Sequence, residues 1–126
     1  MKTLICFDID GVFKQDKEES RYVNGPVDPQ WVKDLLSNGD LITLVSPSPF
    51  YPRDKDGFPM FPIFDKYPSN NYRHKNLQDS INYCRTFFNP ILKLYVSDNG
   101  DWKEAQKAGF VYIDAQMFAN AWRMTS

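Results

Sequence analysis

Polar and acidic side chains follow three apolar runs of the sequence, at the point where each run ends. They are Asp8 and Asp10 after the first run, Ser46 after the second, and Asp98 with Asp101 just beyond the third. Carboxylates as close in sequence as Asp8 and Asp10 repel each other, and in a confined site both cannot stay ionised cheaply. A divalent cation removes this cost, and oxygen ligands in this number suit Mg²⁺.

Phosphoryl transfer is a chemistry that such a set of groups could perform. It needs a nucleophile, a proton carrier for the leaving oxygen, and positive charge on the equatorial oxygens. Mg²⁺ prefers one or two carboxylates, water and a substrate phosphate to an all-protein cage. Lys75 adds an ammonium group near the third run, so one crevice could collect carboxylates, a hydroxyl and a cation.

The elements that must position these residues alternate between strand and helix. Buried-type strands are predicted at 3–9, 41–46 and 91–98, with a short strand at 110–114 and an edge strand at 61–65. Helices are predicted at 28–39, 74–88, 101–109 and 115–124. We therefore expect an α/β fold, a three-layer Rossmann-like parallel sheet of about five strands with flanking helices, whose functional crevice lies at the carboxyl ends of the strands.

Four motifs on these elements carry a family resemblance. "FDIDGV" resembles motif I of the haloacid dehalogenase (HAD) superfamily of phosphohydrolases, and Ser46 after "LITLV" looks like motif II. Lys75 looks like motif III, and "LYVSDNGDWKEAQKAG" looks like motif IV with its following helix. Order and spacing match over about residues 3 to 115. Any one motif is weak, but four in order on suitable elements form a specific signal.

The resemblance implies a Mg²⁺-dependent phosphomonoesterase. Asp8 would be the nucleophile, forming an aspartyl-phosphate, and Asp10 would protonate the leaving oxygen and then activate water. Because Asp10 acts first as an acid, its pKa should be raised when substrate binds. Ser46 would hydrogen-bond the phosphoryl group, and Lys75 would neutralise it.

Two of these assignments have alternatives. Ser46 precedes Pro47, which forces an extended backbone at Ser46, so Ser48 is the alternative hydroxyl if Ser46 points away. Lys66 could fill the role assigned to Lys75.

The resemblance also implies the metal ligands. Asp8, the backbone carbonyl of Asp10, and Asp98 would hold Mg²⁺, with Asp101 behind them or as a further ligand. Motif IV usually spaces its two acids four or more apart or sets them adjacent, whereas Asp98 and Asp101 are three apart. We favour Asp98 as the direct ligand because it is nearer the strand end.

A cap domain, common in this family, has no room in the sequence. The chain is expected to form a single HAD-like domain, 1–126, with a flap at 12–25 and a Pro- and aromatic-rich insertion at 47–74. An insertion of 28 positions is too short for a folded α/β cap. An open site implies either a large substrate that covers the crevice or a neighbouring subunit that acts as a lid, which is compatible with a homo-oligomer.

The composition limits which binding partners and which cellular compartment we expect for this protein. The 126 residues carry a formal net charge of −1, which gives no global attraction to nucleic acid or anionic membrane. The two cysteines, Cys6 and Cys84, are expected to be reduced thiols. No signal-peptide pattern and no apolar stretch near the ~20 residues of a membrane span are found. We therefore expect a cytoplasmic protein with a phosphorylated substrate and no membrane partner.

Two alternatives stay open from the sequence. The first is a non-catalytic HAD-like module that binds metal or phosphate and acts as a regulator, suggested by the irregular motif IV and the missing cap. The second concerns the substrate, which would be a nucleic-acid end phosphate and not a small metabolite. The insertion interleaves aromatic and basic residues, as proteins that grip single-stranded nucleic acid do. Acidic residues within the insertion count against nucleic acid.

Overall fold

The computed structural model of the chain describes residues 2–9, 11–13, 25–28, 31, 34–35, 40–45 and 73–125. Several predicted features lie outside these described residues: Asp10, Ser46, Ser48, Lys66, the edge strand at 61–65, the interior of the flap and nearly all of the insertion at 47–74. The predictions made for them stay predictions.

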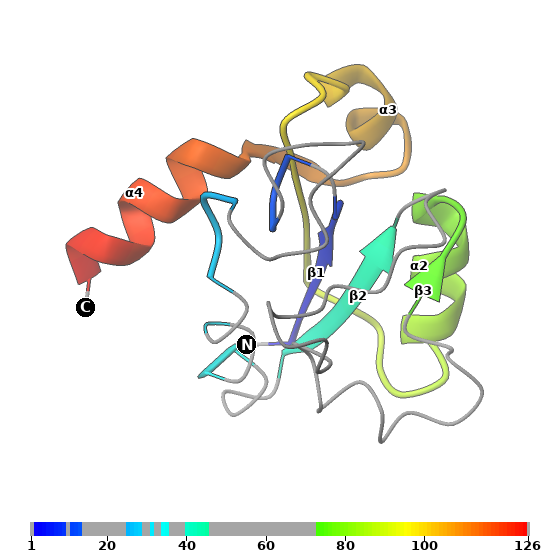
Figure 1. The fold of residues 1–126 in the computed structure, drawn as a ribbon. Helices are drawn as coiled ribbons and strands as arrows, with labels where there is room; N and C mark the ends of the chain where they lie inside the picture. The colour runs from blue at the N-terminus through cyan, green and yellow to red at the C-terminus, as the bar shows by residue number, and fades with distance from the viewer. Residues whose placement is uncertain are drawn as a thin grey trace, which may run out of the picture.

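The described elements alternate between strand and helix, as the sequence predicts (Figure 1). The strands are β1 (Thr3–Phe7), β2 (Leu41–Val45), β3 (Arg73–His74), β4 (Leu92–Ser97) and β5 (Val111–Asp114). The helices are α2 (Leu77–Cys84), α3 (Trp102–Lys107) and α4 (Ala115–Thr125). Trp31, Asp34 and Leu35 are also helical, which agrees with the helix predicted at 28–39, although most of that segment is outside the described residues.

The strands form one sheet in the order β3-β2-β1-β4-β5, and every pairing is parallel. β1 lies at the centre and all five of its residues are buried, which explains why its sequence is apolar without alternation. The α/β class and the parallel sheet are confirmed. Within the described residues the sheet has four strands of four or more residues instead of the expected five or so, because β3 contributes only two residues at the edge.

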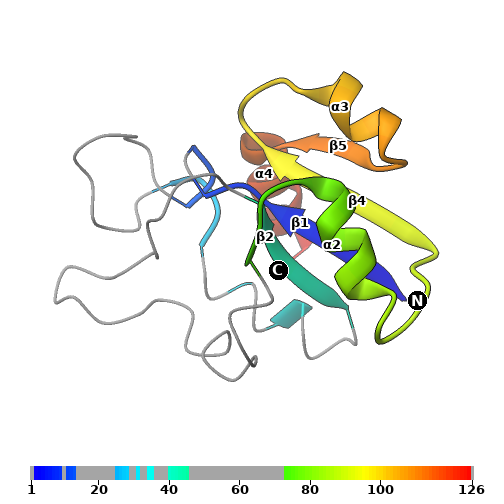
Figure 2. The ribbon, with the colours of Figure 1, turned by 90° about the vertical axis from the view of Figure 1, so that its right-hand side faces the viewer.

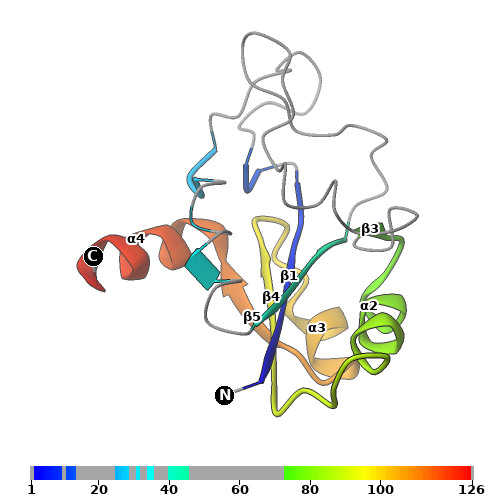
Figure 3. The same cartoon turned by 90° about the horizontal axis from the view of Figure 1, so that it is seen from below.

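Helices cover both faces of the sheet. α2 and α3 lie on one face, where Leu77, Ile81 and Ala105 pack against Leu4 and Cys6 of β1. α4 lies on the other face (Figures 2 and 3). There Ala115 and Phe118 pack against the β1 residues Ile5 and Phe7, and Trp31 stacks on Trp122 with ring centroids 5.3 Å apart.

This placement follows from the winding of the chain. The chain runs from β1 outward to β2 and β3, and then returns to β4 and β5 on the other side of β1. Right-handed crossovers put the connecting helices on opposite faces when the direction of winding reverses. The helical residues after β1 and the connecting helices α2 and α3 accordingly cover different faces of the sheet.

The boundaries of α2 differ from the prediction, while α3 ends as predicted. α2 begins at Leu77 and not at 74, because Asn76 caps it by accepting a hydrogen bond of 2.9 Å from the Asp79 amide. His74 belongs instead to β3. Gly109, with φ +80°, follows α3 in the left-handed conformation that commonly ends a helix. None of the helices in the described ranges has the length and apolar character needed to cross a bilayer.

A small polar network lies between the sheet and α2. The buried Thr43 hydroxyl donates to Cys6 Sγ at 2.9 Å and lies 3.0 Å from the Ser80 hydroxyl. Both cysteines are free thiols, as expected, and burial raises the pKa of Cys6 to about 12. Cys6 is therefore an uncharged part of the core.

Replacing Thr43 with Val keeps the side-chain shape but removes both hydrogen bonds inside a dry core. We expect the free energy of unfolding to fall by about 1–2 kcal/mol, since buried polar groups then lose a partner. Urea denaturation measures this loss. Thr125→Val, at the exposed end of α4, is the control and should change stability by less than about 0.5 kcal/mol. Equal effects of the two substitutions would contradict a stabilising role for the buried network.

Candidate functional site

The reversal of winding creates a crevice at one place in the sheet. β1 and β4 are adjacent, but the connections from their carboxyl ends lead in opposite directions. In open α/β sheets, ligands bind outside the carboxyl ends of the strands at such a switch point. Asp8 directly follows β1 and Asp98 directly follows β4, so two of the predicted site residues flank this point.

Asp8 is half-buried, and hydrogen bonds hold it in place. Its backbone amide continues the ladder to β4 by donating to the Val96 carbonyl at 3.0 Å. The Ile9 amide donates to Asp8 Oδ1 at 2.7 Å, and the Ser97 hydroxyl approaches Asp8 Oδ2 at 3.5 Å. Side chains alternate along a strand, so Asp8 continues the series of Leu4 and Cys6 on the face that α2 and α3 cover.

Asp98 lies directly against the turn that follows β1. Gly11 in that turn has φ +76°, and a Cβ atom there would overlap the carboxylate of Asp98. The contact therefore requires a glycine for two reasons, the positive φ and the absence of a side chain. It brings the acid from β4 next to the motif that begins with Asp8.

Asp8 and Asp98 are two of the predicted magnesium ligands. Mg²⁺ needs only one or two carboxylates from the protein, because water and substrate complete its octahedron. Asp10, whose carbonyl is the third predicted ligand, is outside the described residues. Within the described ranges, no group of three histidine, cysteine or acidic side chains is close enough to hold a metal ion.

Two tyrosines hold the loop that carries Asp98 and Asp101. The Tyr112 hydroxyl on β5 donates to the Ser97 carbonyl at 3.0 Å and accepts a bond of 2.9 Å from the Gly100 amide. Asn99 donates to the Tyr95 hydroxyl at 3.3 Å, and its side-chain oxygen accepts from the Asp101 amide at 2.9 Å. The backbone around both acids is thus tied to β4 and β5.

The hydroxyls of these tyrosines stay protonated and so remain able to donate. Burial raises the pKa of Tyr95, and the negative charge of Asp8 raises it further. Burial also raises the pKa of Tyr112. Tyr112 is not among the predicted site residues. Its position opposite Tyr95 would have indicated its role. That position follows from the pairing of β5 with β4, which the sequence alone does not specify.

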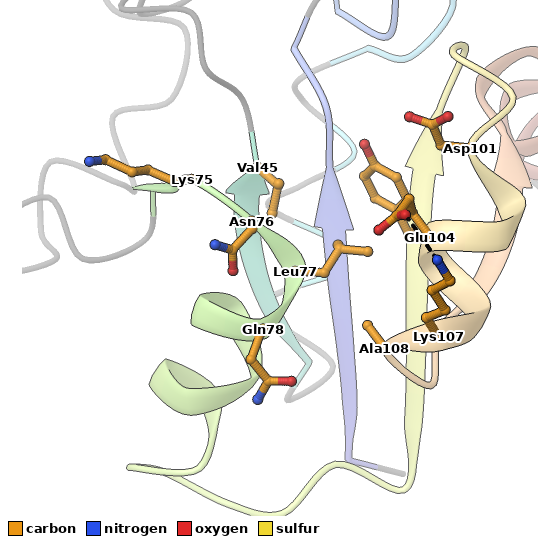
Figure 4. Close-up of a pocket in the computed structure, with 10 residues that line it drawn as sticks. Val45, Lys75, Asn76, Leu77, Gln78, Asp101, Glu104, Lys107 and Ala108 are labelled. Carbon is orange, nitrogen blue, oxygen red and sulfur yellow. Dashed lines mark ion pairs between the residues drawn. The ribbon is translucent and has the colours of Figure 1, made fainter.

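Lys75 is less well placed than the predicted acids. It lies in the turn between β3 and α2, it is exposed, and it lines a cavity that Asp101 also lines. Its side chain extends away from β1 and from Asp101 (Figure 4). The described conformation thus places Asp8 and Asp98 at the ends of adjacent strands, whereas the Lys75 side chain extends away from β1.

Comparisons with protein-family models, with curated proteins and with solved structures found no match to the chain. The site residues and the parallel α/β sheet are therefore the basis for the functional proposal.

Adding a methyl group at Gly11 should disturb the site, whereas the same change at Gly100 should not. Both glycines have a positive φ, of 76° and 74°, so each Ala substitution strains the backbone by roughly 1 kcal/mol. Only at Gly11 does the new Cβ overlap the Asp98 carboxylate, an exposed side chain that must turn away to make room. Urea denaturation should therefore show a somewhat larger loss for Gly11→Ala, because only there must a second side chain move. Equal losses would contradict the contact between Gly11 and Asp98.

Removing the Tyr112 hydroxyl should loosen the loop at 97–101. Tyr112→Phe keeps the ring but deletes the acceptor of the Gly100 amide. Hydrogen exchange of that amide should become about fivefold faster, as expected for the loss of a bond of about 1 kcal/mol, while the Val96 amide keeps its rate. Tyr83→Phe on α2 is the control and should leave Gly100 unchanged. An unchanged Gly100 rate in Tyr112→Phe would show that the hydroxyl does not hold the loop.

Proposed function

We propose that this protein is a Mg²⁺-dependent phosphomonoesterase of the HAD-like type, which acts through an aspartyl-phosphate on Asp8. The observation that carries the proposal is the position of Asp8 and Asp98 at the carboxyl ends of adjacent strands, at the switch point of the sheet, with Asp98 against Gly11. The order of the four motifs along the sequence supports the same conclusion.

The reaction would proceed in two displacements. A carboxylate oxygen of Asp8 attacks phosphorus, a new O–P bond forms, and the bond from phosphorus to the substrate oxygen breaks. Asp10 gives its proton to the departing oxygen. Asp10 then takes a proton from water, which attacks the aspartyl-phosphate and releases inorganic phosphate with Asp8 restored. Hydrogen bonding of Asp8 Oδ1 to the Ile9 amide supports a fixed direction of attack.

The same carboxylates would hold the metal. Asp8 and Asp98 offer oxygen ligands, and the Asp10 carbonyl would add a third. Bound Mg²⁺ would stabilise negative charge on the phosphoryl oxygens. The contact with Gly11 favours Asp98 over Asp101 as the direct ligand, because Asp98 is the acid that lies against the turn after β1.

Release of phosphate from p-nitrophenyl phosphate tests the proposal. The protein should be active with Mg²⁺ and inactive with EDTA, and Asp8→Asn should lower kcat by at least about 10³-fold because the nucleophile is lost. Asp79→Asn, an exposed acid in the first turn of α2, is the matched control and should keep full activity. An active Asp8→Asn protein, or activity unaffected by EDTA, would contradict the mechanism.

The direction of Lys75 favours a second candidate, a non-catalytic module that keeps the site for metal or phosphate binding. Calorimetry with MgCl₂ and inorganic phosphate separates the two candidates. Binding by a folded protein that hydrolyses neither p-nitrophenyl phosphate nor small sugar and nucleotide phosphates, nor a 3′-phosphorylated oligonucleotide, would favour the module. Turnover of any of these esters would exclude it. Higher kcat/KM on the oligonucleotide than on the small phosphates would favour a nucleic-acid end as substrate.

A further inference from the structure

A cavity of about 500 Å³ lies between α2 and α3, and the proposed function leaves it without a role. Side chains of the two helices face each other across it (Figure 4). It is lined by Val45, Lys75, Asn76, Leu77, Gln78, Tyr95, Asp101, Glu104, Lys107 and Ala108. Pockets of this size hold a small organic molecule.

The cavity lies on the same face of the sheet as the Asp8 carboxylate. Val45 and Tyr95 belong to β2 and β4, the strands on either side of β1, and both point to the face covered by α2 and α3. Asp8 points to that face by strand alternation. Burial raises the pKa of Tyr95, a residue of the cavity wall, and the negative charges of Asp8 and Asp101 raise it further.

The lining has no excess charge. Lys75 and Lys107 balance Asp101 and Glu104, and Lys107 also pairs with Glu104 at 3.6 Å. A second anionic group would therefore find no net attraction in the cavity. The amides of Asn76 and Gln78, together with these charged groups, supply many hydrogen-bond donors and acceptors.

The remaining lining residues are apolar or aromatic. Leu77, Val45 and Tyr95 are all buried, so they expose little surface, and Ala108 is the partly exposed apolar residue of the lining. Among the described residues, Tyr95 is the one aromatic side chain that lines the cavity, and it offers little ring surface on which a base could stack. A ligand rich in hydroxyl groups fits this mainly polar lining better than a nucleic-acid base does.

We propose that the cavity binds the leaving group of the phosphomonoester, and that this group is an uncharged, polyhydroxylated alcohol of about monosaccharide size. This inference rests on the proposed function of Asp8. It assigns substrate choice to α2 and α3, so an open site without a cap can still select a small metabolite.

A matched pair of substitutions tests the inference. Gln78 and Gln106 are both exposed glutamines on the helices that cover this face, but only Gln78 lines the cavity. Gln78→Trp should fill the cavity and lower kcat/KM for a hexose 6-phosphate by about tenfold or more, while Gln106→Trp leaves it unchanged. Activity on p-nitrophenyl phosphate should change less than twofold in Gln106→Trp, and in Gln78→Trp it should fall less than the activity on the hexose 6-phosphate, because its leaving group has no polyol to place.

The outcomes separate this inference from the proposed function. Hydrolysis of p-nitrophenyl phosphate that needs Asp8, combined with equal hexose phosphate turnover in both Trp variants, overturns the cavity proposal alone. Preference for a 3′-phosphorylated oligonucleotide that Gln78→Trp does not alter overturns it as well. If no ester is hydrolysed, an NMR titration of the protein with a hexose 6-phosphate decides. Shifts at Gln78 and Ala108 but not at Gln106 support the cavity as a binding site, and their absence overturns it.

Discussion

The central position of β1 is the constraint on which both the fold and the site depend. β1 pairs in parallel with β2 on one side and with β4 on the other, and its five residues are buried. A strand in this position must be apolar on both faces. The first charged side chain comes directly beyond its end, and that residue is Asp8.

Parallel pairing also explains why acids that are distant in sequence lie at the same edge of the sheet. Phe7 of β1 lies opposite Val96 of β4, so Asp8 and Ser97 extend the same register and Asp98 follows immediately. Residues about ninety positions apart in sequence thus lie at one edge of the sheet, because each directly follows a strand. Gly11 then allows the Asp98 carboxylate to approach the backbone of the turn after β1, which no larger residue could permit.

Rigidity around the acids comes from the neighbouring strands and not from the acids themselves. Tyr112 on β5 and Tyr95 on β4 hold the loop at 97–101 through hydroxyl groups that burial keeps protonated. A binding site whose ligating side chains are already held by packed neighbours loses less conformational entropy when a metal or substrate binds. The same Tyr95 forms a wall of the cavity between α2 and α3, so one side chain connects the acidic edge with the proposed leaving-group site.

Sequence alone determined the α/β class, the parallel pairing and the residues at the strand ends, because apolar runs and their polar ends are local patterns. It placed β1, β2, β4 and β5 closely, and it put Asp8 and Asp98 at the ends of strands that prove to be adjacent. It was wrong about the start of α2, because the cap at Asn76 competes with a longer apolar periodicity. It assigned Lys75 a role that the direction of its side chain does not support.

Only the tertiary structure decided which groups support the acids. The contact between Gly11 and Asp98, the hydroxyl of Tyr112 and the cavity between α2 and α3 all join segments that are remote in sequence. Such contacts depend on strand order and register, and no local pattern of residues specifies either. The acidic residues at strand ends can therefore be predicted from the sequence. The residues that position them and the cavity between α2 and α3 depend on how the strands pair.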